Sequence, residues 1–236
     1  MTLVLLQTII QSISSTLYWI GFTVGVRASA QADLRKGRWI VGSAIVFAGW
    51  LFAIVLLGAG GFFRNDVVPP RVPAALMTTL VVGYLALLSP AFRGVVGRIP
   101  QHWLIGIQTF RILGGVFVVR YLEGQLPGIF AIPAGVGDVL TGLLAPLVAY
   151  WWYARKPYAR TAAIAWNLFG MADLVNAVMI GFLAGGAGGG IVFPIVLIPV
   201  YAVPRAFLVH CYSLLGLLRQ TSRQVEPIAA VHGRPA

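Results

Sequence analysis

The chain has 236 residues, of which 59% are hydrophobic and 10% are charged, and its mean hydropathy is +0.88. Soluble domains carry about 25% charged residues, so this chain has too few charges to cover a surface that faces water. The length suits one compact unit, and the composition indicates that this unit lies in a membrane.

The net charge is +11, from 17 basic and 6 acidic residues. Most basic residues lie in short segments between long apolar runs, and no basic stripe or aromatic–basic module is present, which argues against nucleic-acid binding. We expect contacts with anionic lipid headgroups on the cytoplasmic side instead. The single cysteine excludes an intrachain disulfide, and no pair of histidines or cysteines has zinc-ligand spacing. No metal site and no catalytic residue are therefore predicted.

Taken in chain order, seven apolar stretches are long enough to cross a bilayer, which needs about 20 predominantly apolar residues. The predicted spans are 4–26, 39–61, 73–94, 101–121, 127–152, 161–184 and 191–217. The first span lacks the basic n-region of a signal peptide, so we expect it to be retained. The glycine-rich run 185–190 predicts a turn between the last two spans. We predict an all-α bundle of about seven transmembrane helices in a single domain, 1–218, followed by a flexible cytoplasmic tail, 219–236.

The basic residues also predict an orientation. With seven alternating spans, twelve of them fall on one side of the membrane and three on the other. The twelve are Arg27, Arg35, Lys36, Arg38, Arg93, Arg98, Arg155, Lys156, Arg160, Arg219, Arg223 and Arg234. Because the basic side is the cytoplasmic side, the N-terminus is predicted to be extracytoplasmic and the C-terminus cytoplasmic. The predicted location is the bacterial inner membrane, as a multi-pass protein.

Four charged residues lie near the middle of the last four predicted spans: Arg111, Asp138, Asp173 and Arg205. A charge at the bilayer centre costs about 2.5–3.5 kcal/mol on insertion scales, so we expect all four to face the bundle interior. Two positive and two negative charges at one depth favour Arg–Asp pairing. Three polar residues accompany them at helical spacing: Gln108, Asn176 and Tyr201. These seven residues are the candidates for substrate binding or ion coupling.

The first predicted span carries a polar stripe, Gln7, Gln11, Ser14 and Tyr18, at steps of four, three and four residues. This spacing puts the four side chains on one helix face. We expect that face to line one side of the charged cluster. Spans two and three are less polar and are interpreted as scaffold.

Prolines predict irregular backbone in two spans. Pro127 and Pro133 precede Asp138 in span five, and Pro194, Pro199 and Pro204 recur in span seven. Each proline removes an amide donor and frees a carbonyl one turn earlier. Interrupted helices at membrane depth are tolerated where they line a cavity, and they often build the binding sites of transporters.

His210, in the last span, allows a haem ligand, a proton relay or a hydrogen-bonded packing role, and the sequence requires no cofactor. The leading hypothesis is a small transporter or permease, in which Arg111 and Arg205 attract an anionic group and the aspartates bind protons or a cation. One alternative is a non-catalytic accessory or binding subunit whose charges only lock helices together. Another is a membrane enzyme that handles haem, quinone or lipid. Expected partners are a small molecule or ion, and a second copy or a partner subunit; no enzymatic activity is assigned.

Overall fold

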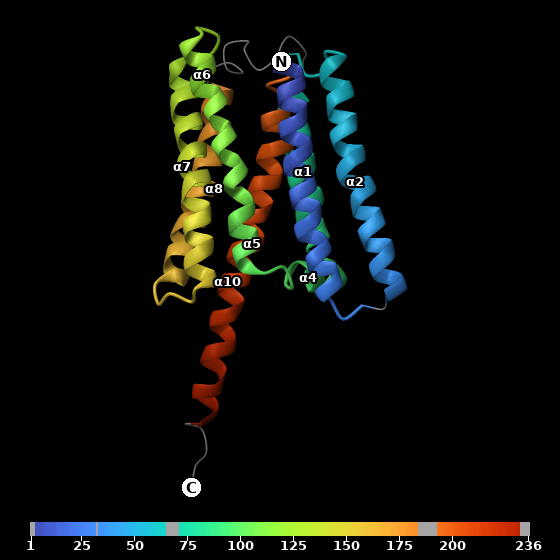
Figure 1. Cartoon of the computed structure of the whole chain (residues 1–236), viewed down its shortest axis with the longest axis vertical. Helices are drawn as coiled ribbons and strands as arrows, with labels where there is room; N and C mark the ends of the chain where they lie inside the picture. The colour runs from blue at the N-terminus through green and yellow to red at the C-terminus, as the bar shows by residue number, and fades with distance from the viewer. Residues whose placement is uncertain (1–2, 32, 65–70, 184–192, 232–236) are drawn as a thin grey trace.

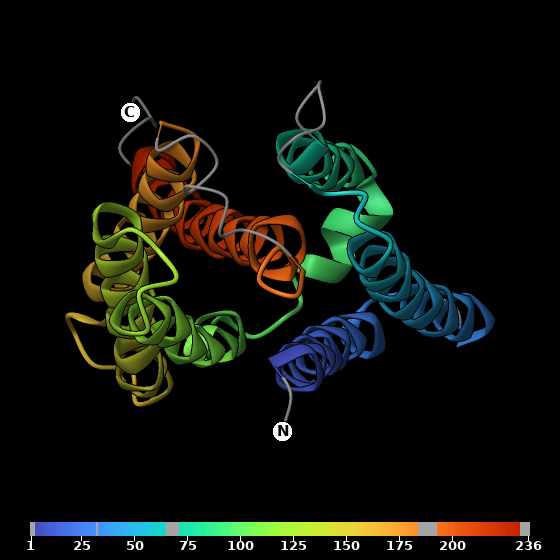
Figure 2. The same ribbon diagram turned by 90° about the horizontal axis from the view of Figure 1, so that it is seen from above.

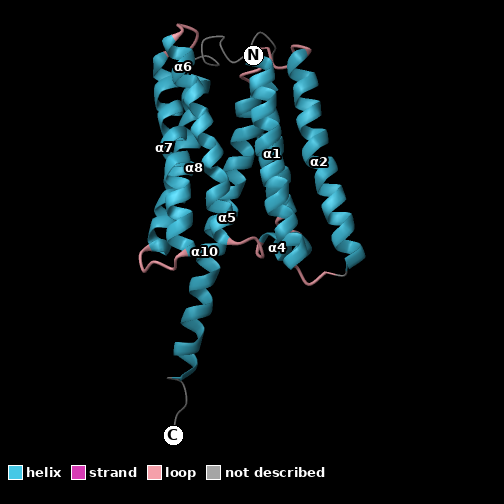
Figure 3. Ribbon diagram, in the orientation of Figure 1, coloured by secondary structure: helices cyan, strands magenta, loops and turns pink. Residues whose placement is uncertain are grey.

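The computed structural model describes residues 3–31, 33–64, 71–183 and 193–231. The described residues form helices joined by short loops and contain no strand (Figure 3). The helices are α1 (Leu3–Ala28), α2 (Asp33–Ala59), α3 (Arg71–Ala86), α4 (Pro90–Val96), α5 (Gln101–Gly106), the 3₁₀-helix η1 (Ile107–Gly115), α6 (Val116–Leu122), α7 (Gly128–Tyr153), α8 (Ala159–Leu183), the π-helix η2 (Ile198–Ala202) and α10 (Val203–Val231).

The membrane-spanning fold is confirmed. Among the described residues, six helical segments are long and apolar enough to cross a membrane, and a seventh is added if the bent pair α3–α4 counts as one span. The chain is thus an all-helical, multi-pass membrane protein of six to seven spans.

The helices form two groups with α10 between them (Figures 1 and 2). One group holds α5, α6, α7 and α8, and the other holds α1, α2 and α3. Successive spans run in opposite directions, so the α1–α2 loop, α4 and the α7–α8 loop lie at the end where α10 leaves the bundle (Figure 1). The basic segments predicted to share one side therefore do share one end, while the assignment of that end to the cytoplasm remains a prediction.

The third predicted span, 73–94, is not one straight helix. Its axis bends by 97° between α3 and α4. The Ser89 side chain accepts a hydrogen bond from the Phe92 amide at 3.4 Å, and Pro90 occupies the start of α4. Serine at the N-cap followed by proline is a helix-start signal, so this break was readable in the sequence.

Irregular backbone follows the prolines in only one of the two predicted spans, span seven. Helix α7 is continuous through Pro133 and Pro146, so the interruption expected in span five is absent. Instead, span four contains the nine-residue 3₁₀ segment η1 with Arg111 at its centre, although 3₁₀ runs longer than three or four residues are uncommon. In span seven, helix begins with the short π-helix η2, and residues 191–192 lie outside the described residues.

Helix α10 is longer than the predicted last span. It continues to Val231, so residues 219–231, predicted as a flexible tail, are helical. This part of α10 projects beyond the bundle (Figure 1). The last residues, 232–236, lie outside the described part of the chain.

Helices α2 and α3 are held to the bundle from different sides. The Trp19 indole on α1 donates to the Ile40 carbonyl of α2 at 3.2 Å. The Tyr212 hydroxyl on α10 donates to the Gly83 carbonyl of α3 at 3.1 Å, and Leu208 of α10 packs where a Gly83 side chain would be. Helix α2 thus rests on α1, and α3 rests on α10.

The predicted orientation can be tested with C-terminal fusions. A green fluorescent protein fused after Ala236 should fluoresce, and alkaline phosphatase fused there should be inactive, because the basic end is expected in the cytoplasm. Alkaline phosphatase fused after Phe63, beyond α2, should be active. The reverse pattern of activities would contradict the orientation.

Candidate functional site

Both aspartates pair with the same arginine. Arg111 Nε donates to Asp138 Oδ1 at 2.7 Å, and Arg111 Nη2 donates to Asp173 Oδ2 at 2.5 Å. The Arg111 side chain is 2% exposed. The predicted Arg–Asp pairing is therefore found at Arg111, which lies on η1 between α7 and α8 and reaches both carboxylates. This group of three, here called the charged triad, has a formal net charge of −1.

Glycines make room for the triad where the three segments meet. A side chain at Gly137 of α7 would overlap the Asp173 carboxylate, and one at Gly114 of η1 would overlap Asp138. A Cβ at Gly170 of α8 would lie 2.5 Å from the His210 ring. These close approaches of backbone to polar side chains need residues without a side chain.

His210 holds the triad to α10. Its Nε2 lies 3.1 Å from Arg111 Nη1, and its Nδ1 lies 2.9 Å from Asn167 Oδ1. A guanidinium only donates hydrogen bonds, so Nε2 accepts and the proton is on Nδ1. With both nitrogens engaged, neither is left for a haem iron, and Arg111 separates the ring from the two carboxylates. The arrangement fits the hydrogen-bonded packing role.

The network continues towards the basic end of the bundle. Asn167 Nδ2 donates to Ser213 Oγ at 2.8 Å, and Gln101 Nε2 donates to the same hydroxyl. Gln101, at the start of α5, also donates to the Ser213 carbonyl at 3.3 Å. These bonds connect α5, α8 and α10 between the triad and the basic end of the bundle.

Arg205 contacts different groups from those around Arg111. Its Nε donates to the Tyr201 carbonyl at 2.9 Å, and its Nη2 donates to Gln11 Oε1 at 3.1 Å and Ser14 Oγ at 3.2 Å. Its guanidinium carbon lies 3.6 Å from the Tyr201 ring centre and 5.0 Å from that of Tyr18. No described carboxylate pairs with Arg205, and its Nη1 is buried without a hydrogen-bond acceptor. Within the described part of the chain, its positive charge is stabilised by dipoles and aromatic faces and by no carboxylate.

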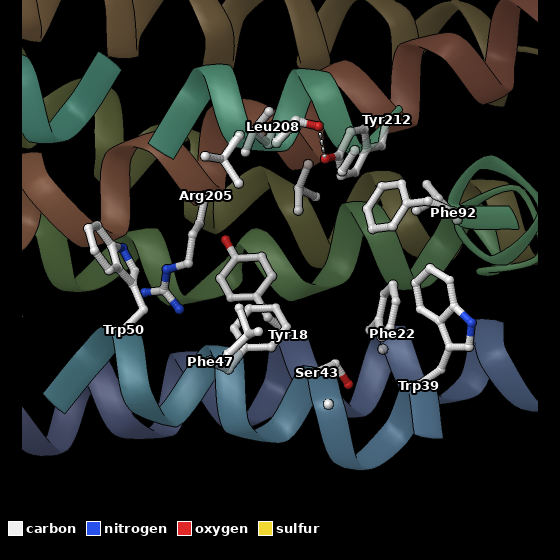
Figure 4. Close-up of a pocket in the computed structure, with 18 of the residues that line it drawn as sticks. Tyr18, Phe22, Trp39, Ser43, Phe47, Trp50, Phe92, Arg205, Leu208 and Tyr212 are labelled. Carbon is white, nitrogen blue, oxygen red and sulfur yellow. Dashed lines mark hydrogen bonds between the residues drawn. The ribbon is translucent and has the colours of Figure 1, made fainter. Parts of the chain in front are cut away.

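Arg205 lies at one end of a cavity of about 980 Å³ between α1, α2, α3, α4, α5 and α10 (Figure 4). At the same end, Trp50 of α2 turns its indole nitrogen towards the Arg205 guanidinium. The Trp50 Nε1 is a second buried donor without an acceptor. From there the wall continues with the aromatic side chains of Tyr18, Phe47, Phe22, Trp39 and Phe92. Arg35 and Arg38 line the cavity at the basic end of the bundle.

Two further candidates have different outcomes. Gln108 is buried, and its Nε2 donates to the Ala206 carbonyl at 2.9 Å while its Oε1 accepts from the Tyr18 hydroxyl at 3.4 Å. Asn176 does not join the cluster, since its side chain lies on an exposed part of α8. Three residues advance an α-helix by about 300°, so Asn176 is about 60° round the helix from Asp173 and lies beyond the edge of the buried face.

The polar stripe of α1 is buried, as predicted. Gln7, Gln11, Ser14 and Tyr18 are between 1% and 6% exposed. Gln7 and Gln11 line a second, small cavity of about 30 Å³ together with Arg111 and Asp138, and Gln7 Oε1 is buried without a donor. That volume has room for one water molecule. Since Gln11 also accepts from Arg205, α1 joins the triad to the second arginine.

Trp50 was missed because span two was interpreted as scaffold. Tryptophan is expected at the membrane interfaces, but Trp50 lies in the middle of α2, and a buried indole N–H usually has an acceptor. A mid-span tryptophan was therefore a usable signal. Helices α2 and α3 are walls of the cavity, not merely scaffold.

Comparison with known proteins gives a family and a distant relative. Residues 69–218 match the family described as a domain of unknown function (DUF8737). The chain is 27% identical over 170 residues to the voltage-gated ClC-type chloride channel ClcB of Salmonella typhimurium, and 28% identical over 173 residues to ClcB of Salmonella typhi. Each similarity covers 69% of this chain and 39% of the relative, so the chain spans about two fifths of the length of these curated relatives. No solved structure matches.

The shared arginine predicts an order of stabilities. Arg111→Gln leaves two buried carboxylates without a counter-ion and should cost about 3–5 kcal/mol of unfolding free energy. Asp138→Asn leaves the Arg111–Asp173 pair intact and should cost less, about 1.5–3 kcal/mol. Unfolding in mixed micelles measures both.

The control for this order is Glu123→Gln, which removes the exposed Arg120–Glu123 pair and should cost less than about 1 kcal/mol. Equal losses for Arg111→Gln and Asp138→Asn would contradict the shared pairing.

Proposed function

We propose that this chain, which belongs to the DUF8737 family, is a membrane transporter or channel-like protein that binds the anionic group of its substrate at Arg205. The observation that carries the proposal is the end of the large cavity, where Arg205 Nη1 and Trp50 Nε1 are both buried donors without acceptors. An anion between them would accept from both and would neutralise the arginine.

The two buried arginines differ in charge balance. Arg111 is over-compensated by two carboxylates, so the charged triad repels an anion. Among the described residues, the groups in contact with the Arg205 guanidinium are the Gln11 and Ser14 side chains, a backbone carbonyl and two tyrosine rings. Such groups stabilise a cation without cancelling its charge. Of the two arginines predicted to attract an anion, only Arg205 is therefore proposed to bind one.

The charged triad is the candidate site for a positively charged species. Asp138 shares Arg111 with Asp173, and it borders the small cavity beside Gln7. We propose that a proton or a small cation binds there while Arg205 holds the anion. Gln11 lines the small cavity and accepts from Arg205, so it would couple the two sites.

The relatives support an anion-handling role. ClcB is named as a chloride channel, and its similarity to this chain agrees with a protein that handles anions. The match covers a minor part of ClcB, so chloride is not carried over as the substrate. The bacterial inner membrane is the proposed location.

The anion site can be tested by ligand-induced stabilisation. Chloride, acetate, phosphate and a long-chain fatty acid are added separately to the purified protein, and the unfolding temperature is measured. At 100 times its dissociation constant a ligand stabilises by about 2.7 kcal/mol, so at least one anion should raise the unfolding temperature. Arg205→Gln should abolish that rise, and Arg205→Lys should keep part of it, because the charge remains.

Trp50→Phe provides a second variant that keeps the aromatic ring and removes the indole donor. It should weaken anion binding several-fold, about the loss of one hydrogen bond to a charged group. Arg120→Gln, at an exposed pair on α6, is the control and should bind like the parent. Stabilisation that is unchanged in Arg205→Gln, or absent for all four anions, would overturn the proposal.

A further inference from the structure

We infer that the ligand of the large cavity is an anionic amphiphile from the bilayer, with one anionic headgroup at Arg205 and a single apolar chain along the aromatic wall. This inference rests on the proposed function and names the class of substrate. It follows from the wall, the opening and the length of the cavity.

The wall suits a chain and not a bare hydrated anion. Beyond Arg205 and Trp50, the cavity is lined mainly by aliphatic and aromatic side chains. The hydroxyls of Ser43, Thr78 and Thr79 also line it, and each donates to a backbone carbonyl of its own helix. An anion without a chain would lose its hydration shell and gain only two hydrogen-bond donors. It would also leave most of the apolar wall without a contact. A volume of about 980 Å³ lies in the range of sites for organic ligands, about 300–1,000 Å³.

The cavity opens towards the lipid between α2 and α3. Ile45 and Val46 of α2 and Val82 of α3 line it, and they are 67%, 68% and 61% exposed. These residues lie at membrane depth, so the surface that they share with the cavity faces acyl chains. An amphiphile can pass between these helices without leaving the apolar phase.

The length of the wall also fits a chain. Along α2 the lining residues run from Arg35 at the basic end to Trp50 beside Arg205. At 1.5 Å per residue this stretch is about 22 Å long, most of the thickness of the hydrocarbon core. Arg35 and Arg38 would attract anionic headgroups to the basic end, and Arg205 would hold one deeper in the bundle.

Two glycines of α2 keep the middle of this path open. Gly42 and Gly49 both line the cavity, and a Cβ at either position would have no neighbour within 4 Å. A large side chain at Gly42 can therefore enter the cavity without displacing backbone. Gly37, on the same helix and outside the cavity lining, is equally unobstructed, which provides a matched control.

The test uses quenching of tryptophan fluorescence by a fatty acid brominated in mid-chain, because Trp39, Trp50 and Trp103 line the cavity. The full chain is placed in nanodiscs of zwitterionic lipid and titrated with the brominated acid or with its uncharged methyl ester. Saturable quenching by the acid is expected. Arg205→Gln should weaken it at least tenfold, as for other truncated buried charge contacts, while Arg205→Lys should lose less.

Gly42→Phe should weaken binding of the brominated acid about tenfold by filling the path of the chain, and Gly37→Phe should bind like the parent. Quenching by the methyl ester as strong as that by the acid, and equal in Arg205→Gln, would show unspecific lipid contact and overturn the inference. If acetate or chloride stabilises the protein through Arg205 while the brominated acid does not quench, the inference fails and the proposed function stands. If no anion depends on Arg205, both fail.

Discussion

The sharing of Arg111 by Asp138 and Asp173 determines how the other charges are arranged. Charges buried in a low dielectric must find partners or remain costly, and here two carboxylates from α7 and α8 converge on one guanidinium. The glycines of η1, α7 and α8 let the backbones approach closely enough for this contact. Because both aspartates point to Arg111, Arg205 has no carboxylate among the described residues.

The bundle accordingly has two parts with different properties. Around the triad, α5 to α8 and η1 are joined by direct polar contacts that continue through His210 and Asn167. Around Arg205, α1, α2 and α3 enclose the large cavity. Helix α10 belongs to both parts: Arg205 and His210 are five residues apart, which turns them by about 140° on an α-helix. One side chain therefore faces the cavity and the other faces the triad.

The region matched by the DUF8737 family, residues 69–218, contains only part of the candidate site. Residues 69–218 include both arginines, both aspartates and His210, whereas the polar stripe of α1 and Trp50 of α2 precede the matched region. The wall that would make Arg205 a binding site is thus built from two segments: α10 within the matched region, and α1 with α2 before it. The proposed ligand would bind where these segments meet.

The sequence by itself determined that the chain lies in a membrane, and it located most of the spans. It also determined which loops share one end of the bundle, and that four charges and the α1 stripe face inwards. These properties depend on residue type and spacing, because lipid penalises every exposed charge. Only the tertiary structure decided which charges pair, that Asn176 lies outside the cluster and that Trp50 lies beside Arg205. Pairing depends on the rotation of each helix about its axis. A nine-residue 3₁₀ segment turns about 20° more per residue than an α-helix, or about half a turn over η1. Arg111 is the fifth residue of η1, so about a quarter of a turn has accumulated where its side chain leaves the helix, and no pattern in the sequence predicted this rotation.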